Sequence, residues 1–161
     1  MIRLAVAGDL PRVVAIYNAS IPGRLATADT DPVTVEQRRP WFAAHGARRP
    51  LWVDEREGVV LGWVSLSSFY GRPAYGATVE LSVYVAPEAQ RRGVARALVA
   101  HAIAAAPQLG VTTLLGFVFG HNAPSLALLG QHGFTRWGHL PQVAVLDGAE
   151  RDLDILGLRV G

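Results

Sequence analysis

The stretch ATVELSVYVAPEAQRRGVARALVAHAIAAA, residues 77–106, decides the fold. Its first part, residues 78–85, is rich in β-branched and aromatic residues and is followed by Pro87, a pattern typical of a β-strand. Its last part has apolar residues at helical spacing before Pro107: Ala95, Leu98, Val99, Ala102, Ile103 and Ala106. The turn between them, QRRGVA, brings two arginines and a glycine to the start of the helix. Free N–H groups and positive partial charge there favour a phosphate, so this turn is a candidate pyrophosphate site.

Gly93 in this turn has two possible roles. It would let a phosphate approach the backbone with no side chain in the way, or it would only ease the turn, with the arginines in solvent. The wider pattern favours the first role. Gln90-x-x-Gly93-x-Ala95, after a strand ending in Val83-Tyr84-Val85, resembles the acetyl-CoA signature of the GNAT acetyltransferase superfamily. The sequence contains no G-x-G-x-x-G and no G-x-x-x-x-G-K-[ST] motif, which excludes two rival phosphate motifs.

The composition predicts one globular domain over residues 1–161. Half of the residues are hydrophobic and 17% are charged. A net charge of +2, without a basic cluster interleaved with aromatics, argues against nucleic acid. All 15 basic residues are arginines, so the high pI says little about partners.

Several kinds of chemistry can also be excluded from the sequence. Cysteine is absent, so there is no disulfide and no cysteine nucleophile, and the thiol of any reaction must come from a cofactor. The five histidines lack metal-binding spacing and no G-x-S-x-G motif occurs, so we expect no metal site and no serine nucleophile. No signal-peptide pattern occurs, and we expect a cytoplasmic protein without a membrane partner.

The rest of the chain supplies the other elements of the resembled fold. We expect a loop at residues 21–31 and a second one at 69–76, which enters the central strand. Strands are predicted at residues 2–6, 51–54, 59–67, 78–85, 111–119, 136–146 and 151–160. Four helices are predicted. The first starts with Asp9 as its cap, the second covers residues 33–45, the third ends at Ala106, and the fourth runs from Asn122 to near Gly133. This order fits the GNAT fold, an α+β fold with a central mixed, mostly antiparallel sheet flanked by helices, and the resemblance covers nearly the whole chain.

Glu80 is the candidate general base. GNAT enzymes, which this chain resembles, transfer acetyl from acetyl-CoA to an amine by direct attack. Glu80 lies on a strand otherwise suited to burial, so it is either functional or ion-paired with an arginine. Residues 78–85 closely resemble the same segment of the phosphinothricin acetyltransferase branch, whose glutamate there acts in catalysis. Proton transfer from an α-amine to an unperturbed glutamate is uphill by roughly 5 kcal/mol, so we favour a route through water.

The resemblance also implies the acetyl-CoA site. Val83, Tyr84 and Val85 would face the pantetheine arm and the acetyl carbonyl. The pyrophosphate would be surrounded by Arg91, Arg92, Gly93, Val94, Ala95 and Arg96. Asn122 and Ser125 are helix-capping residues on either side of Pro124. In the resembled family the matching asparagine contacts the CoA arm, and we expect Asn122 to do both.

The general acid is less well defined. Many GNAT enzymes place a tyrosine after the glycine that ends the last helix, and this chain has Phe134 there, which cannot donate a proton. His121, at the end of the apolar strand, is a candidate substitute, although such a histidine can also be a polar residue that merely ends a strand. Water can protonate the leaving thiolate if neither residue does.

The acceptor is inferred from residues that precede Glu80. Arg72 and Tyr75 stand at the spacing found in the phosphinothricin acetyltransferase branch, where an arginine could hold a carboxylate with two hydrogen bonds; a solvated Arg72 is the alternative. Residues 140–143 and Leu153-Asp154 also resemble this branch, in which such strands build the acceptor pocket and a homodimer. The resemblance implies a homodimeric amino-acid N-acetyltransferase for phosphinothricin or methionine sulfoximine. The alternatives are another small amine, such as an aminoglycoside or polyamine, and a non-catalytic CoA-binding sensor.

Overall fold

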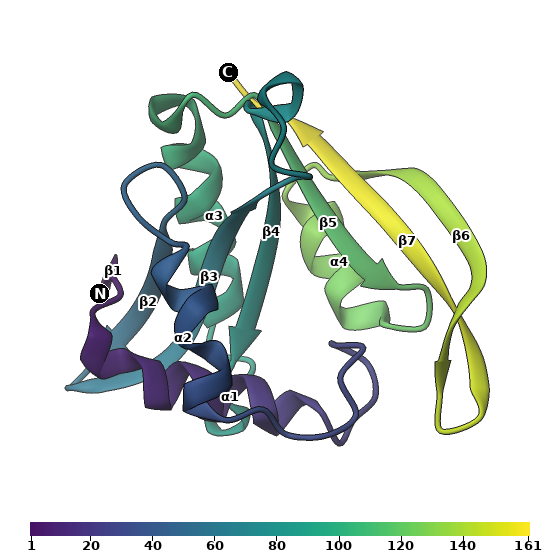
Figure 1. The fold of residues 1–161 in the computed structure, drawn as a ribbon, viewed down its shortest axis with the longest axis horizontal. Helices are drawn as coiled ribbons and strands as arrows, with labels where there is room; N and C mark the ends of the chain where they lie inside the picture. Colours follow the sequence, from purple (N-terminus) through teal and green to yellow (C-terminus); the bar gives the residue numbers. More distant parts are fainter.

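The computed structural model describes all residues, 1–161, and its centre is one seven-stranded sheet (Figure 1). The strands lie in the order β1-β2-β3-β4-β5-β7-β6. Their bounds are β1 Ile2–Leu4, β2 Leu51–Arg56, β3 Val59–Ser68, β4 Thr78–Val85, β5 Thr113–Phe119, β6 Thr135–Leu146 and β7 Ala149–Arg159. Only β4 and β5 pair in parallel, and every other neighbouring pair is antiparallel. The predicted α+β fold with a mixed, mostly antiparallel sheet is confirmed.

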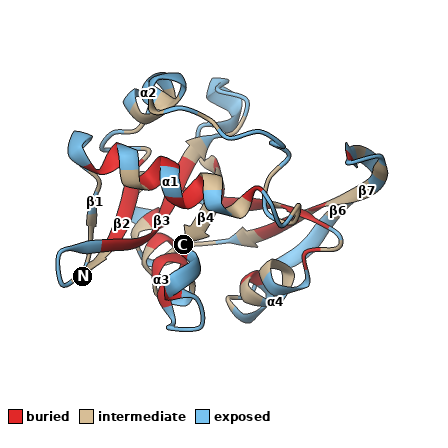
Figure 2. Cartoon of the chain, turned by 90° about the horizontal axis from the view of Figure 1, so that it is seen from below, coloured by how far each residue is buried: buried red, intermediate tan, exposed pale blue.

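Helices cover both faces of the sheet (Figure 2). They are α1 Leu10–Ser20, α2 Val35–Ala43, α3 Val94–Ala105 and α4 Ala123–Gln131. Adjacent residues of β3 identify the two faces, because successive side chains of a strand point to opposite sides. The Trp63 ring N–H donates to the Val13 carbonyl of α1 at 3.1 Å, whereas a Cβ on Gly62 would lie 2.8 Å from Val94 of α3. In Figure 2, α2 lies on the α1 side and α4 on the α3 side. None of these helices has the length and apolar character needed to cross a membrane.

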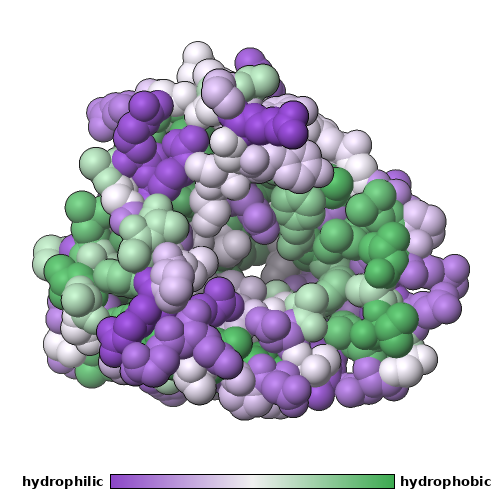
Figure 3. Space-filling view, in the orientation of Figure 1, coloured by the Kyte–Doolittle hydropathy of each residue, from purple (hydrophilic) through white to green (hydrophobic).

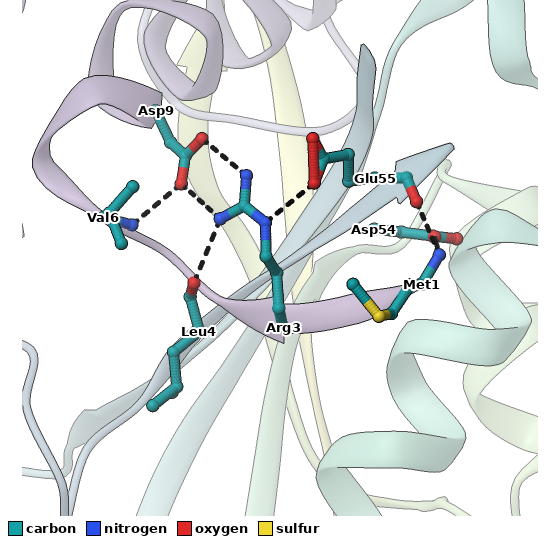
Figure 4. A network of polar contacts seen from close by, with 7 residues as sticks. All are labelled: Met1, Arg3, Leu4, Val6, Asp9, Asp54 and Glu55. Atoms are coloured by element: carbon teal, nitrogen blue, oxygen red, sulfur yellow. Dashed lines mark hydrogen bonds and ion pairs between the residues drawn. The ribbon is translucent and has the colours of Figure 1, made fainter. Parts of the chain in front are cut away.

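The first helix confirms one expectation and corrects another. The helix begins directly after Asp9, as predicted, and its apolar stripe, Leu10, Val13, Val14 and Tyr17, is buried. Asp9 occupies the N-cap position, but its side chain does not cap the helix. Instead the carboxylate accepts two hydrogen bonds from Arg3, at 2.8 and 3.0 Å, and one from the N–H of Val6 (Figure 4). A short 3₁₀ turn before α1 turns Asp9 toward β1, where the guanidinium is a stronger, charged donor.

The second helix is shorter than predicted. It begins at Val35 because the Thr34 hydroxyl accepts from the N–H of Gln37 while the Gln37 side chain accepts from the N–H of Thr34. Residues 21–34, between the first two helices, contain no regular helix or strand, as predicted for 21–31. The two hairpins turn at Glu57-Gly58 and Asp147-Gly148, and all four residues have φ between 52° and 80°. Such positive φ values suit two-residue turns between antiparallel strands.

The feature that shapes the site is the separation of β4 from β5. Their parallel pairing covers only Thr78–Glu80 against Thr113–Leu115. Beyond Glu80, β4 continues along β3 as far as Val85, while β5 continues along β7 (Figure 1). A large apolar core holds the two halves together, with Val79 on β4, Leu98 on α3 and Leu114 on β5 fully buried. The sheet is therefore continuous at one end of these strands and open at the other.

Candidate active site

A cavity of about 410 Å³ lies where β4 and β5 separate. Figure 3 shows a hollow near the middle of the face on which Figure 1 shows the two strands diverging. The wall is formed by β4, β5, α4, residues 25–28 after α1, and the hairpin of β6 and β7. Fourteen of the 20 lining residues are hydrophobic, and Glu80 is the only charged one. The cavity therefore suits a mostly apolar ligand with one polar reacting group beside Glu80.

Glu80 stands at the last position where β4 is paired on both sides, with Ser67 of β3 and Leu115 of β5. Its side chain is half-buried in the cavity wall. Burial raises the pKa of the Glu80 carboxyl, and no charged neighbour or hydrogen bond contributes to the shift. The arginine partner that would make Glu80 a structural ion pair is absent. A carboxylate in this position is available to accept a proton from a ligand in the cavity.

The open edge of β4 supplies backbone donors to the cavity. The N–H of Ala86 donates to the Leu61 carbonyl of β3, and peptide groups alternate along a strand. The N–H groups of Val83 and Val85 therefore point toward β5, where the pairing has already ended. Val83 lines the cavity, whereas Val85 lies beyond it. The peptide group of Tyr84 faces β3, so this residue contributes its ring, which packs 4.8 Å from Trp63 on the α1 face.

The predicted pyrophosphate turn lies beyond the cavity lining, at the start of α3. Gly93 is the N-cap residue with φ of 77°, and nothing lies within 4 Å of the position that its Cβ would take. Arg91, Arg92 and Arg96 are exposed, and Arg96 reaches only Gln131, at 3.4 Å. Val94 is buried in the core and Ala95 is half-buried, so these two can offer an anion only their main chain. The open glycine, the free helix end and the exposed guanidinium groups fit a pyrophosphate.

Asn122 joins two parts of the cavity wall. Its Oδ1 accepts from the N–H of Ser125 at 3.2 Å, which confirms the predicted cap of α4. Its Nδ2 donates to the Leu25 carbonyl at 3.1 Å. Asn122 and Ser125 both line the cavity, on the α4 side.

His121 and Phe134 do not line the cavity. His121 lies 2.8 Å through Nε2 from the Arg24 carbonyl, to which it donates, and its ring stacks on Phe119 with centroids 5.6 Å apart. The other ring nitrogen, Nδ1, is buried without a partner. Phe134 is 4% exposed and belongs to the core. For His121 to act as general acid, its ring would first have to leave the Arg24 carbonyl.

Arg72 and Tyr75 lie in the exposed loop that enters β4, outside the cavity lining. A series of rings connects this loop to the cavity. The Tyr75 ring lies 5.5 Å from Phe69, which stacks on Phe117 at 6.5 Å, and Phe117 lines the cavity. The loop is therefore adjacent to the Glu80 end of the cavity, and the cavity wall itself contains no arginine.

The sequence did not predict several of the residues that form the cavity wall. Residues 25–28 were expected only to lie in a loop, and their side chains follow no helical or strand period. Phe117 lies in a strand whose residues are almost all apolar. The sequence therefore could not show that Phe117, in particular, lines the cavity. The structure contains no group of three or more histidine, aspartate or glutamate side chains that could hold a metal ion.

Known proteins resemble this chain over almost its full length. The chain is 50% identical over 157 residues to a Bacillus subtilis protein named "Putative phosphinothricin acetyltransferase YwnH", covering 97% of this chain and 96% of that one. It is 31% identical over 160 residues to the L-methionine sulfoximine/L-methionine sulfone acetyltransferase of Salmonella typhimurium, covering 99% and 94%. The crystal structure of a phosphinothricin acetyltransferase from Sinorhizobium meliloti, in complex with acetyl-CoA, superposes with a TM-score of 0.94 at 28% identity, covering 100% and 88%.

The sequence pattern of the family described as "Acetyltransferase (GNAT) family" matches residues 13–134, from within α1 to the residue before β6. This match includes the strand–turn–helix unit, Glu80 and the cap of α4. Together with the full-length relatives and the shared fold, it shows that the chain belongs to the GNAT acetyltransferase family.

Proposed function

We propose that this protein transfers the acetyl group of acetyl-CoA to the amine of a small amino acid or analogue, such as phosphinothricin or methionine sulfoximine. The single observation that carries the proposal is the half-buried Glu80 carboxylate, without an ionic partner, at the point where β4 and β5 separate. The named substrates of the relatives support this acceptor class. A polycationic acceptor, such as an aminoglycoside or polyamine, is disfavoured because Glu80 is the only carboxylate in the cavity wall.

Acetyl-CoA supplies the acetyl group as a thioester that an amine can attack. The main-chain N–H of Val83 would polarise the thioester carbonyl. The start of α3 around Gly93, with Arg91, Arg92 and Arg96, would hold the pyrophosphate. Asn122 and Ser125 would contact the pantetheine arm, since both line the cavity at the start of α4.

Glu80 would take the proton of the acceptor ammonium through a water molecule. Its raised pKa brings the carboxylate closer to the proton affinity of the amine and reduces the roughly 5 kcal/mol gap between unperturbed groups. Arg72 would bind the acceptor carboxylate from the loop before β4, and Tyr75 would continue the aromatic wall formed by Phe69 and Phe117. Because His121 is hydrogen-bonded elsewhere, we propose that water protonates the departing thiolate.

We further propose a homodimer formed through β6. This strand is the edge of the sheet and carries four exposed large apolar side chains: Trp137, Leu140, Val143 and Val145. In Figure 2 the hairpin of β6 and β7 projects away from the rest of the molecule. Val143 also lines the cavity, so a second copy there would help to close it. Analytical ultracentrifugation tests this proposal: wild type should sediment as a dimer and Val145→Glu as a monomer. A cytoplasmic location remains a prediction from the sequence.

The experiment that tests the function is an amine screen with acetyl-CoA, read by the free thiol of CoA. Because the protein has no cysteine, a thiol reagent gives no protein background. We expect amino acids and analogues with a free carboxylate, such as phosphinothricin or methionine sulfoximine, to give the fastest release. Thiol release with none of the amino acids but with polyamines would favour the alternative acceptor class. Binding of acetyl-CoA without turnover of any amine would favour a sensor.

A further inference from the structure

Three consecutive backbone carbonyls in the loop after α1 are held by side chains from distant elements. The carbonyl of Arg24 accepts from His121 Nε2 at 2.8 Å. The carbonyl of Leu25 accepts from Asn122 Nδ2 at 3.1 Å, and that of Ala26 from the hydroxyl of Tyr84 at 3.0 Å. One donor comes from β4 and two come from the segment after β5. The two diverging strands are thus joined through the same short piece of loop.

The segment held in this way forms the wall of the cavity on the Glu80 side. Residues 25–28 line the cavity, and the loop continues from α1, which packs against the face that carries the Tyr84 ring. Glu80 and Tyr84 are four positions apart on β4, an even spacing, so their side chains share this face. The hydroxyl of Tyr17 on α1 is hydrogen-bonded to Thr27 and Asp29, in the part of the loop that follows. The loop is thus fixed on the side from which an amine must approach Glu80.

We propose that His121, Asn122 and Tyr84 are positioning residues that hold residues 24–26 as the acceptor wall, so that His121 controls acceptor binding and transfers no proton. The inference rests on the proposed function, because it assigns this wall to the amine. Asn122 also caps α4, so the acceptor wall and the acetyl-CoA side of the cavity are joined through one side chain. Stacking on Phe119 fixes the orientation of the His121 ring toward its carbonyl.

His121 offers the cleanest test, because two substitutions separate its shape from its hydrogen bond. His121→Phe keeps an aromatic ring against Phe119 and removes both the donor and the unpartnered Nδ1. His121→Gln keeps an amide donor at similar reach. His101→Phe is the matched control, because His101 lies on α3 against Trp52 and outside the cavity lining. Tyr84→Phe removes the third donor and keeps the ring.

The first measurement needs no substrate. Trypsin cleaves after arginine, and the bond between Arg24 and Leu25 is the one whose carbonyl His121 holds. Cleavage there requires local opening of the loop, so loss of one hydrogen bond should accelerate it by roughly 2- to 10-fold in His121→Phe. Cleavage after Arg92, in the exposed turn before α3, is the internal reference and should not change. His121→Gln should restore protection, and His101→Phe should match wild type.

The second measurement is kinetic. We expect His121→Phe and Tyr84→Phe to raise the acceptor KM by roughly 2- to 10-fold, with acetyl-CoA affinity and kcat at saturating acceptor unchanged. Wild-type cleavage after Arg24 together with wild-type KM would overturn the proposal. A fall in kcat with unchanged KM and unchanged cleavage would also overturn it, because it would make His121 a proton donor. The cleavage result stands whether or not an amino acid proves to be the acceptor, so the two proposals can fail separately.

Discussion

Glu80→Gln should reduce activity without reducing stability. A lost general base lowers turnover by roughly 10²- to 10⁴-fold, which corresponds to about 2.7–5.4 kcal/mol in the activation free energy. The same carboxylate is half-buried with no donor, and burial raises its pKa. Ionising it therefore opposes folding. The neutral amide removes this cost, so the variant should unfold at the wild-type temperature or above it at pH 7.

The raised pKa of Glu80 also predicts how the stability difference between Glu80→Gln and wild type changes with pH. A carboxyl whose pKa is higher in the folded state than in the unfolded state binds more protons when folded. Its contribution to stability is therefore greatest below the ordinary glutamate pKa of about 4.3 and falls as pH rises through the raised value. The difference in melting temperature between Glu80→Gln and wild type should widen in the variant's favour over this range. Wild-type kcat/KM should rise over the same range as Glu80 ionises, and the variant should lack this rise.

The assay combines CoA release with thermal melts from pH 4 to pH 8. A structural ion pair at Glu80 would give the opposite stability result, because removing the carboxylate would leave an arginine without its partner. Unchanged turnover at all pH values would remove Glu80 from the mechanism. Lower stability of the variant across the whole range would refute the argument from desolvation.

Other predictions address the cofactor, the acceptor and the fold. Gly93→Asn should reduce the thermal stabilisation by millimolar acetyl-CoA, whereas Gly58→Asn, at a similarly open glycine with φ of 78°, should keep it. Arg72→Ala should raise the KM of an amino acid roughly 10- to 150-fold but not that of its amide, and equal losses on both substrates would make Arg72 structural. Arg3→Met should destabilise the protein by about 1.5–3 kcal/mol at pH 7, because Arg3 lowers the pKa of Asp9 by hydrogen bonding. This contribution is present above the ordinary aspartate pKa of about 3.9 and is lost as pH falls through the lowered value, so the two melting curves should converge in acid.

The sequence predicted those parts of the fold whose signal is carried by side-chain pattern. The β-branched and aromatic residues before Pro87 located β4, and the apolar residues at helical spacing after Gly93 located α3. The Asn-x-Pro sequence located the cap of Asn122. Asp9 was correctly placed at a helix start, but its true partner, Arg3, lies on another element, and no local pattern reports such a contact. Position in the chain suggested His121 as a proton donor, whereas its partner in the structure is a backbone carbonyl. Carbonyls are the same in every residue, so the sequence could not single out those of residues 24–26.

The geometry of one strand explains why the candidate chemistry gathers where it does. In β4, side chains alternate between the two faces of the sheet, while peptide groups alternate between its two edges. Glu80 and Tyr84 therefore point to the α1 face, and the N–H of Val83 points to the edge that β5 has left. If β5 stayed paired beyond Leu115, that N–H would be satisfied and no cavity would form. In the proposed mechanism, the early end of the pairing would give a thioester carbonyl its donor and an amine its access to Glu80.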